Sequence, residues 1–300
     1  MKRLALTLSL CMFLVPFLSA QTQPSFLATS DKLSFQDKNQ DSIDLLNQHL
    51  PSAATANEQA EIYWRLSRDT LHKADDMRSQ GAASDVVLAM YKQGEGYADR
   101  AIELDPSSAK GYYWKASNIG RWGQTRGILS SLFQADPMRK LLVQSATLDP
   151  SQGDAWFVLG QLYEQVPGFP LSFGNPVWAV SLGRKAVDAR TAEWKQGTVP
   201  DVPEDYFIQL ANHLAKRNWS AAKRLSEHPA EAQKYSLTTD VVEKNFYYEG
   251  NVSTPNLSDK QEAVALVQTV VDTLQAVADR TAAQNRDLKN AQDDLSSWSH

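Results

Sequence analysis

The chain has 300 residues, 42% hydrophobic and 22% charged, and its 30 basic and 35 acidic side chains leave a formal net charge of −5. This acidic balance, without a basic cluster, argues against nucleic acid or an anionic membrane as a partner. The length is sufficient for one or two domains, each with an ordinary hydrophobic core.

Residues 1–20 have the pattern of a secretory signal peptide. Lys2 and Arg3 precede an apolar run over 4–18 that is too short to span a bilayer comfortably, and Ala20 offers a small residue for cleavage. An uncleaved anchor is the alternative. Cys11, the single cysteine, would be removed with the signal peptide. The exported chain could then form no disulfide, so its fold must be stabilised by its hydrophobic core. We therefore expect a periplasmic or secreted protein.

The chain then repeats itself after 44 residues. "AIELDPSSAKGYYWKA" at 101–116 aligns with "ATLDPSQGDAWFVLG" at 146–160, so that two Leu-Asp-Pro turns coincide. A period of this length predicts one helix–turn–helix unit per repeat. Extended in both directions, the pattern predicts about five units over 21–235, all helical.

The fourth unit carries a recognisable motif. Trp156, Leu159, Gly160 and Tyr163 have the spacing W-x-x-L-G-x-x-Y, and Asn175-Pro176 opens a second helix with small residues on one face. In these residues the chain resembles the tetratricopeptide repeat. The resemblance implies an all-α fold, a right-handed solenoid of helical hairpins, and a role in binding other proteins.

Two narrower resemblances cover about residues 60 to 225. "YYWKASNIGRWG" and "ATLDPSQGDAWFVLGQLYEQV" are similar to segments of regulator of microtubule dynamics proteins and of periplasmic tetratricopeptide lipoproteins associated with TRAP-type solute transporters. The signal peptide favours the second group, which implies a helper of small-molecule uptake. The chain departs from that group in lacking a lipobox, and no transporter-docking residue can be carried over.

The third and fourth units exceed the family's usual length of about 34 residues at the turn between their two helices. Because each unit repeats one geometry, we expect two inserted loops along one edge of the stack. They either fill the core as plugs or close a pocket. Their apolar residues are Trp122, Leu129, Leu132 and Phe133 in the third unit and Phe169, Leu171 and Phe173 in the fourth.

Helical spacing predicts which side chains share the inner face of the stack. They are mainly aromatic, amide or cationic, which suits an apolar or weakly anionic ligand and lacks the Lys and Asn clamp that some tetratricopeptide proteins use for acidic peptide C-termini. Together with Trp122, Phe169 and Phe173 from the loops, the predicted binding residues are Tyr113, Ser117, Arg121, Phe157, Gln161, Gln165, Ile208, Asn212 and Lys216.

The end of the chain departs from the repeat pattern. A linker is expected over 236–257, and Ser258 is a suitable cap for one long helix over 258–300. Its apolar stripe predicts that it shields the end of the solenoid, because terminal repeats need a polar outer face. A coiled-coil dimer contact is the alternative.

Signatures of catalysis are missing from the sequence. The five histidines have no zinc spacing, and "DKNQDSIDLLNQ" lacks the glycine and glutamate of a calcium loop. No nucleophile elbow or phosphate-binding loop is present. We therefore expect no enzyme, no metal and no cofactor. The predicted function is an exported scaffold that binds an envelope protein or peptide; the alternative is a small, partly apolar ligand in a pocket closed by the inserted loops, as an accessory to solute transport.

Overall fold

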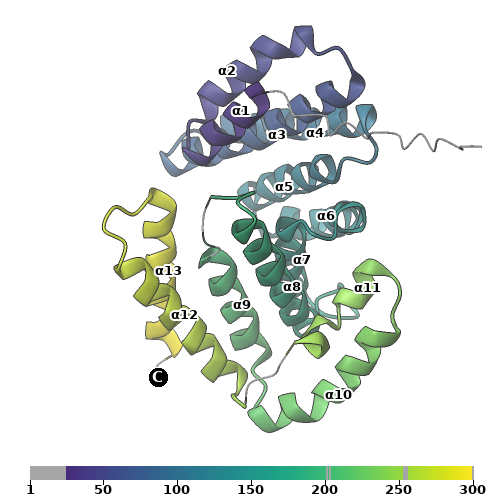
Figure 1. Ribbon diagram of the computed structural model, residues 1–300, viewed down its shortest axis with the longest axis vertical. Helices are drawn as coiled ribbons and strands as arrows, with labels where there is room; N and C mark the ends of the chain where they lie inside the picture. The colour runs from purple at the N-terminus through teal and green to yellow at the C-terminus, as the bar shows by residue number, and fades with distance from the viewer. Residues whose placement is uncertain (1–24, 201, 203, 253–255, 299–300) are drawn as a thin grey trace, which may run out of the picture.

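The computed structural model describes residues 25–200, 202, 204–252 and 256–298, which form helices joined by turns (Figure 1). The predicted signal peptide lies outside these residues. Successive helices pack as hairpins in a curved array, so the prediction of an all-α helical-hairpin fold is confirmed. The hairpins are α1 (Ser25–Phe35) with α2 (Asn39–His49), α3 (Ala56–Ser79) with α4 (Ser84–Leu104), α5 (Ala109–Arg126) with α6 (Ile128–Leu148), and α7 (Gly153–Gln165) with α8 (Pro176–Lys195).

The C-terminal part continues with further helices. They are α9 (Glu204–Arg217), α10 (Ala221–Leu237), the short α11 (Val241–Asn245), α12 (Asp259–Gln275) and α13 (Ala282–Trp298), and two short 3₁₀ helices, η1 (Leu50–Ser52) and η2 (Tyr248–Asn251), complete the set. Among the described residues, none of these helices is both long enough and apolar enough to cross a membrane.

The 44-residue repeat appears in the structure as two equivalent helix ends. Asp105 follows α4 and Asp149 follows α6, with nearly the same backbone angles. The Asp105 carboxylate accepts the backbone N–H of Ser107 at 2.9 Å and its hydroxyl at 2.5 Å, and Asp149 accepts the same groups of Ser151 at 3.0 and 2.5 Å. Each Leu-Asp-Pro turn therefore ends one hairpin and starts the next.

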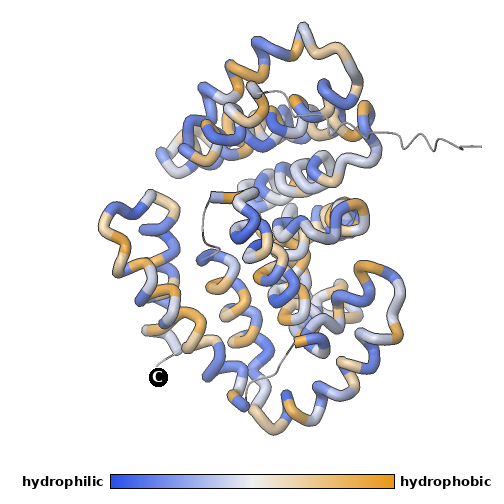
Figure 2. Tube along the Cα trace, in the orientation of Figure 1, coloured by the Kyte–Doolittle hydropathy of each residue, from blue (hydrophilic) through white to orange (hydrophobic). Residues whose placement is uncertain are grey.

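The motif residues of the fourth unit lie in the core. Trp156 and Leu159 are fully buried, and the Trp156 indole N–H donates to the carbonyl of Pro150 at 2.9 Å. Tyr163 contacts an aromatic cluster with ring centroids 5.2 to 5.5 Å away, formed by Phe173, Trp178 and Phe246. In Figure 2 hydrophobic and hydrophilic stretches alternate along the helices, as expected when one face of each is buried.

Two glycines make room for a buried histidine. A Cβ atom at Gly160 would lie 2.9 Å from Nε2 of His213, and one at Gly183 would lie 2.6 Å from its Cδ2. His213 comes from α9, is fully buried, and is hydrogen-bonded through Nδ1 to Glu164. Gly160 therefore allows the close contacts of α7 with α8 and with α9.

One of the two predicted inserted loops is helical. α5 continues to Arg126 and α6 begins at Ile128, so only Gly127, with φ at 105°, forms the joint. The extra residues of the third unit lengthen both helices, and the loop prediction for this unit was wrong. In the fourth unit a loop does connect α7 to α8 over 166–175.

The end of the solenoid also differs from the prediction. α9 packs on α12, not on α10, which turns away from the array (Figure 1). The predicted linker over 236–257 contains α11 and η2, which pack against α6, α8 and α10. The predicted single helix over 258–300 is a hairpin of α12 and α13, because Thr281 and Gln284 form a reciprocal cap that starts a new helix.

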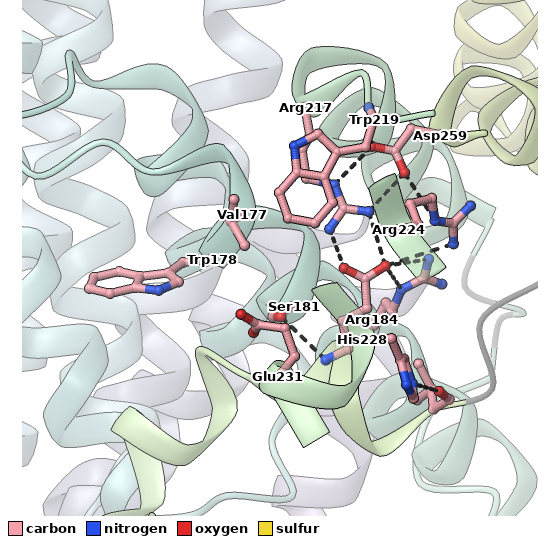
Figure 3. Close-up of polar contacts among 12 residues, drawn as sticks. Val177, Trp178, Ser181, Arg184, Arg217, Trp219, Arg224, His228, Glu231 and Asp259 are labelled. Carbon is pink, nitrogen blue, oxygen red and sulfur yellow. Dashed lines mark hydrogen bonds and ion pairs between the residues drawn. The ribbon is translucent and has the colours of Figure 1, made fainter. Parts of the chain in front are cut away.

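A buried charge cluster joins the helices at this end. Three arginines and three carboxylates meet where α8, α9, α10, η2 and α12 converge. Figure 3 shows the three arginines together with Asp259. Arg217, at the end of α9, donates from Nε and Nη2 to Asp259 at 2.8 and 2.7 Å and also pairs with Glu249. The cluster therefore fixes α12 beside α9. Its six members are Arg184, Arg217, Arg224, Glu249, Asp259 and Glu262.

Candidate functional site

A cavity of about 320 Å³ lies between α7, α9 and α13. α9 directs one face into the core, with Leu210 and Leu214 buried, and turns the opposite face to the cavity. The cavity residues of α13 recur three and four positions apart, which places them on one helical face. The lining consists of Phe157 from α7, of Asp205, Ile208, Gln209 and Asn212 from α9, and of Asp287, Asn290, Asp293 and Asp294 from α13.

The wall formed by α13 is held by a polar contact to α9 and by packing. The side-chain amide of Asn212 donates to Asp294 Oδ2 at 3.2 Å. Ala291, on the inner face of α13, is fully buried. The floor is apolar, because Ile208 is buried and the Phe157 ring lies 4.4 Å from the ring of Tyr206. An apolar floor thus meets an acidic wall.

Four aspartates give the cavity its negative charge. Burial, followed by repulsion from Glu204, raises the pKa of Asp287 to about 6, although Arg286 acts in the opposite direction. Burial also raises the pKa of Asp294, which repulsion from Asp293 increases further. The Asp205 side chain is exposed, but the helices packed around it reduce its hydration and so raise its pKa. Repulsion from Asp287 raises this pKa further. The folded chain therefore holds Asp205, Asp287 and Asp294 in surroundings that disfavour their charge.

This electrostatic cost predicts that Asp287→Asn stabilises the free protein. A carboxyl with a raised folded-state pKa destabilises the fold at pH above that pKa, and the cost disappears as pH falls through about 6 towards the pKa of the unfolded chain. At pH 7.5 we expect a gain on the order of 1 kcal/mol in the free energy of unfolding, after allowance for solvent screening. Urea denaturation at pH 7.5 and pH 4 measures it, and an equal gain at both would contradict the electrostatic cause.

The arrangement is suited to an organic cation with an apolar stem. The stem would lie on Phe157 and Ile208 while the charged group meets the carboxylates of α13. Among the described residues, the side chains of histidine, cysteine, aspartate and glutamate form no group of three or more arranged to hold a metal ion. The predicted preference for a weakly anionic ligand does not fit this cavity, because its wall is acidic.

Three of the predicted binding residues line the cavity: Phe157, Ile208 and Asn212. Gln161 lies beside them and donates to the cavity residue Gln209 at 2.9 Å. Helical spacing thus placed these side chains on faces of α7 and α9 that meet in the structure.

The other predicted residues are not brought to the cavity. On α5, the Ser117 hydroxyl donates to the carbonyl of Tyr113, and Arg121 pairs with Asp75 at 3.0 Å. Trp122 lies near the ammonium group of Lys92, 5.0 Å from it. Gln165 and Lys216 are exposed at the far ends of their helices.

The inserted loop does not close the cavity either. Phe173 packs on Tyr163 at the C-terminal end of α7, whereas the cavity residue of α7, Phe157, lies near the start of that helix. Phe169 is 93% exposed. Phe173 is therefore a packing residue, and Phe169 neither fills the core nor lines the cavity.

The carboxylates of α13 were missed because their sequence resembles a solvated helix face. Asp293 and Asp294 face the cavity only because the chain reverses direction between α12 and α13. The signal that could have revealed this turn is the Thr281-x-x-Gln284 pattern, which marks the start of a helix.

Residues 26–168, just under half of the chain, match the model of the family described as regulator of microtubule dynamics protein 1-3. The match begins and ends earlier than the resemblance over about 60 to 225 suggested. It covers α1 to α7 and includes Phe157, whereas the cavity residues of α9 and α13 lie beyond it. No curated protein matches the chain significantly. Family and fold together support a helical repeat-like protein.

Proposed function

We propose that the protein is an exported, non-enzymatic binding protein of the tetratricopeptide type, which holds a basic segment of an envelope protein in the cavity between α7, α9 and α13. The observation that carries the proposal is the cavity itself, in which four aspartates stand over an apolar floor. Export rests on the signal-like residues 1–20.

The size of the cavity favours a side chain of a partner over a larger free ligand. About 320 Å³ is at the small end of the range of small-molecule sites, roughly 300 to 1,000 Å³. One arginine or lysine side chain fits that space, and its alkyl part would cover Phe157 while its charged end reaches Asp287 and Asp294. The rest of the peptide would lie along α9 and α13, as in other helical-repeat proteins.

The family match supports a role in protein interaction in general terms. Its description names regulators of microtubule dynamics, and residues 26–168 match that family model. For this chain we carry over the interaction role alone, because the acidic wall of the cavity lies outside the matched residues.

Binding of short peptides to the purified chain, measured by isothermal titration calorimetry, tests the proposal. An arginine- and lysine-rich peptide should bind, and a glutamate-rich peptide of equal length should not. The double variant Asp287→Asn/Asp294→Asn should weaken binding by about tenfold or more, since two charge-assisted hydrogen bonds are lost. Asp279→Asn, an exposed position at the turn between α12 and α13, is the matched control. Equal effects of the control and the double variant would refute the site.

The pH dependence of this binding follows from Asp287. Because its pKa is raised to about 6, its charge is lost as pH falls through that value, and affinity for the basic peptide should fall between pH 7 and pH 5. In Asp287→Asn this decline should be smaller. A wild-type affinity that is constant over this range would show that Asp287 does not contact the peptide. Native mass spectrometry of the same samples distinguishes a bound peptide from a small organic cation that co-purifies.

A further inference from the structure

A second surface of the molecule, distant from the cavity, exposes large apolar side chains. Ile128, Leu129 and Phe133 on the first turns of α6 are 87%, 73% and 80% exposed, and Phe169 and Leu171 in the following hairpin's loop are 93% and 83% exposed. Monomeric soluble proteins rarely expose several large apolar side chains together without a use for them. We call these five residues the apolar edge.

The fold brings the two parts of the apolar edge to the same end of the array. α6 leads into α7 through a tight turn at 149–152, so the start of α6 and the end of α7 lie at the same end of the pair. The guanidinium of Arg139, in the middle of α6, lies 5.0 Å from the ring of Phe173, so the loop over 166–175 packs against α6. The two parts of the apolar edge therefore project from the same end of the pair of α6 and α7.

Positive charge exceeds negative charge beside the apolar edge. Residues 121–140 contain four arginines or lysines and a single aspartate, Asp136, which pairs with both Arg139 and Lys140, although the chain as a whole has a net charge of −5. The loop over 166–175 has no charged residue. Arg126 is exposed next to the edge and lies 5.3 Å from the ring of Trp122. The sequence showed no basic cluster, because these cations are separated along the chain by apolar residues.

We propose that the apolar edge docks on the surface of an anionic membrane. Protruding aromatic and aliphatic side chains would enter the boundary between headgroups and acyl chains, and Arg126, Arg139 and Lys140 would contact the anionic headgroups. Stable attachment of a protein to a membrane surface generally needs two such signals, an apolar one and a basic one. The edge supplies both without a membrane-spanning helix.

The shape of the edge favours a lipid surface over a protein partner. An apolar anchor in a protein interface usually has its energy concentrated in a well-packed, desolvated pocket. Here the Phe169 ring is 93% exposed at the tip of a loop and Ile128 is 87% exposed at a helix start, so the side chains project from the surface. A bilayer accepts such projections without a complementary shape.

Vesicle co-sedimentation of the full chain tests the proposal. The chain should bind vesicles of phosphatidylcholine with phosphatidylglycerol about tenfold or more tightly than vesicles of phosphatidylcholine alone, and high salt should weaken the binding. The double variant Phe133→Ala/Phe169→Ala should lose about tenfold in affinity for the anionic vesicles. Both side chains are exposed, so the melting temperature should not change.

Phe35→Ala/Leu225→Ala is the matched control, because these side chains are 48% and 68% exposed on α1 and on the first turns of α10. It should bind as the wild type does. The N-terminal apolar run is present in every variant, so binding through that run would leave Phe133→Ala/Phe169→Ala at the wild-type level and overturn the proposal. Equal binding to both kinds of vesicle, or no binding at all, would overturn it as well. The peptide test of the cavity is independent of all these outcomes.

Discussion

Arg217→Met should lower the free energy of unfolding by about 3–5 kcal/mol, because it leaves buried carboxylates without their main partner. The Arg217 side chain is 1% exposed, pairs with Glu249 and Asp259, and lies 4.3 Å from the ring of Trp219. Methionine keeps the volume and removes the charge, so the loss measures the ion pairs more than the packing. Because these pairs fix α12 beside α9, we also expect α12 and α13 to exchange amide hydrogens faster in the variant.

Urea denaturation measures the loss, and Lys223→Met is the matched control. Lys223, next to Arg224 in the chain, makes an exposed ion pair with Glu227 at 2.5 Å outside the cluster, and such pairs contribute only about 0 to 1 kcal/mol. A loss below about 1 kcal/mol for Arg217→Met would show that α12 is held by its apolar stripe alone.

The same cluster predicts how stability responds to acid. Burial alone would raise the pKa values of Glu249 and Glu262, but the surrounding arginines outweigh it and hold both below their ordinary values. The stabilisation is therefore complete above the pKa of an unfolded glutamate, about 4.3, and is lost as pH falls further. In Arg217→Met the decline in this range should be shallower.

Gly183→Ala should be the next largest loss, about 1–3 kcal/mol, because the new methyl group would overpack the interface of α8 and α9. Its Cβ atom would lie 2.6 Å from Cδ2 of His213 and 3.3 Å from Leu210. The His213 ring cannot move aside readily, since it is fully buried and bonded to Glu164. Thermal or urea denaturation gives the value.

Two comparisons isolate the cause of that loss. Gly96→Ala in α4 adds a methyl group that meets no atom within 4 Å, and it should stabilise the chain by about 0.5–1 kcal/mol through helix propensity. Combined with His213→Ala, the Gly183→Ala change should cost much less than in the wild type. An undiminished cost in that background would assign the strain to the backbone of α8.

Local sequence patterns predicted the first four hairpins because their signals lie within each unit. Trp156 and Tyr163 are spaced so that they share one face of a helix, and both are buried. The Asn175 carboxamide caps α8, as the Asn-Pro pair in the sequence indicated. The prediction of a loop in the third unit was wrong because no local signal there distinguishes a loop from longer helices. Gly127 is the single residue that breaks the helical pattern there, and an excess length of chain says nothing about whether it extends a loop or two helices.

The cavity could be predicted only on one side. Phe157, Ile208 and Asn212 were accessible to spacing arguments, because each lies on a helix whose buried face is evident from sequence. The opposite wall depends on long-range packing of α13 over α9, and no local pattern encodes which helix covers which. Asp294, which bonds to Asn212 across 82 residues of chain, shows the separation involved.

The separation in sequence between α9 and α12 also sets the order in which the helices can fold. When α9 leaves the ribosome, Arg217 cannot form its ion pair with Asp259 until that residue, 42 positions later, has been synthesised. The earlier hairpins need only their neighbours, so they can fold during synthesis, whereas the C-terminal end closes last. The acidic wall belongs to α13, the last helix described. A ligand held between α9 and α13 would therefore bind only chains in which α13 has been synthesised and packed on α9, and by mass action it would protect this part of the fold from unfolding.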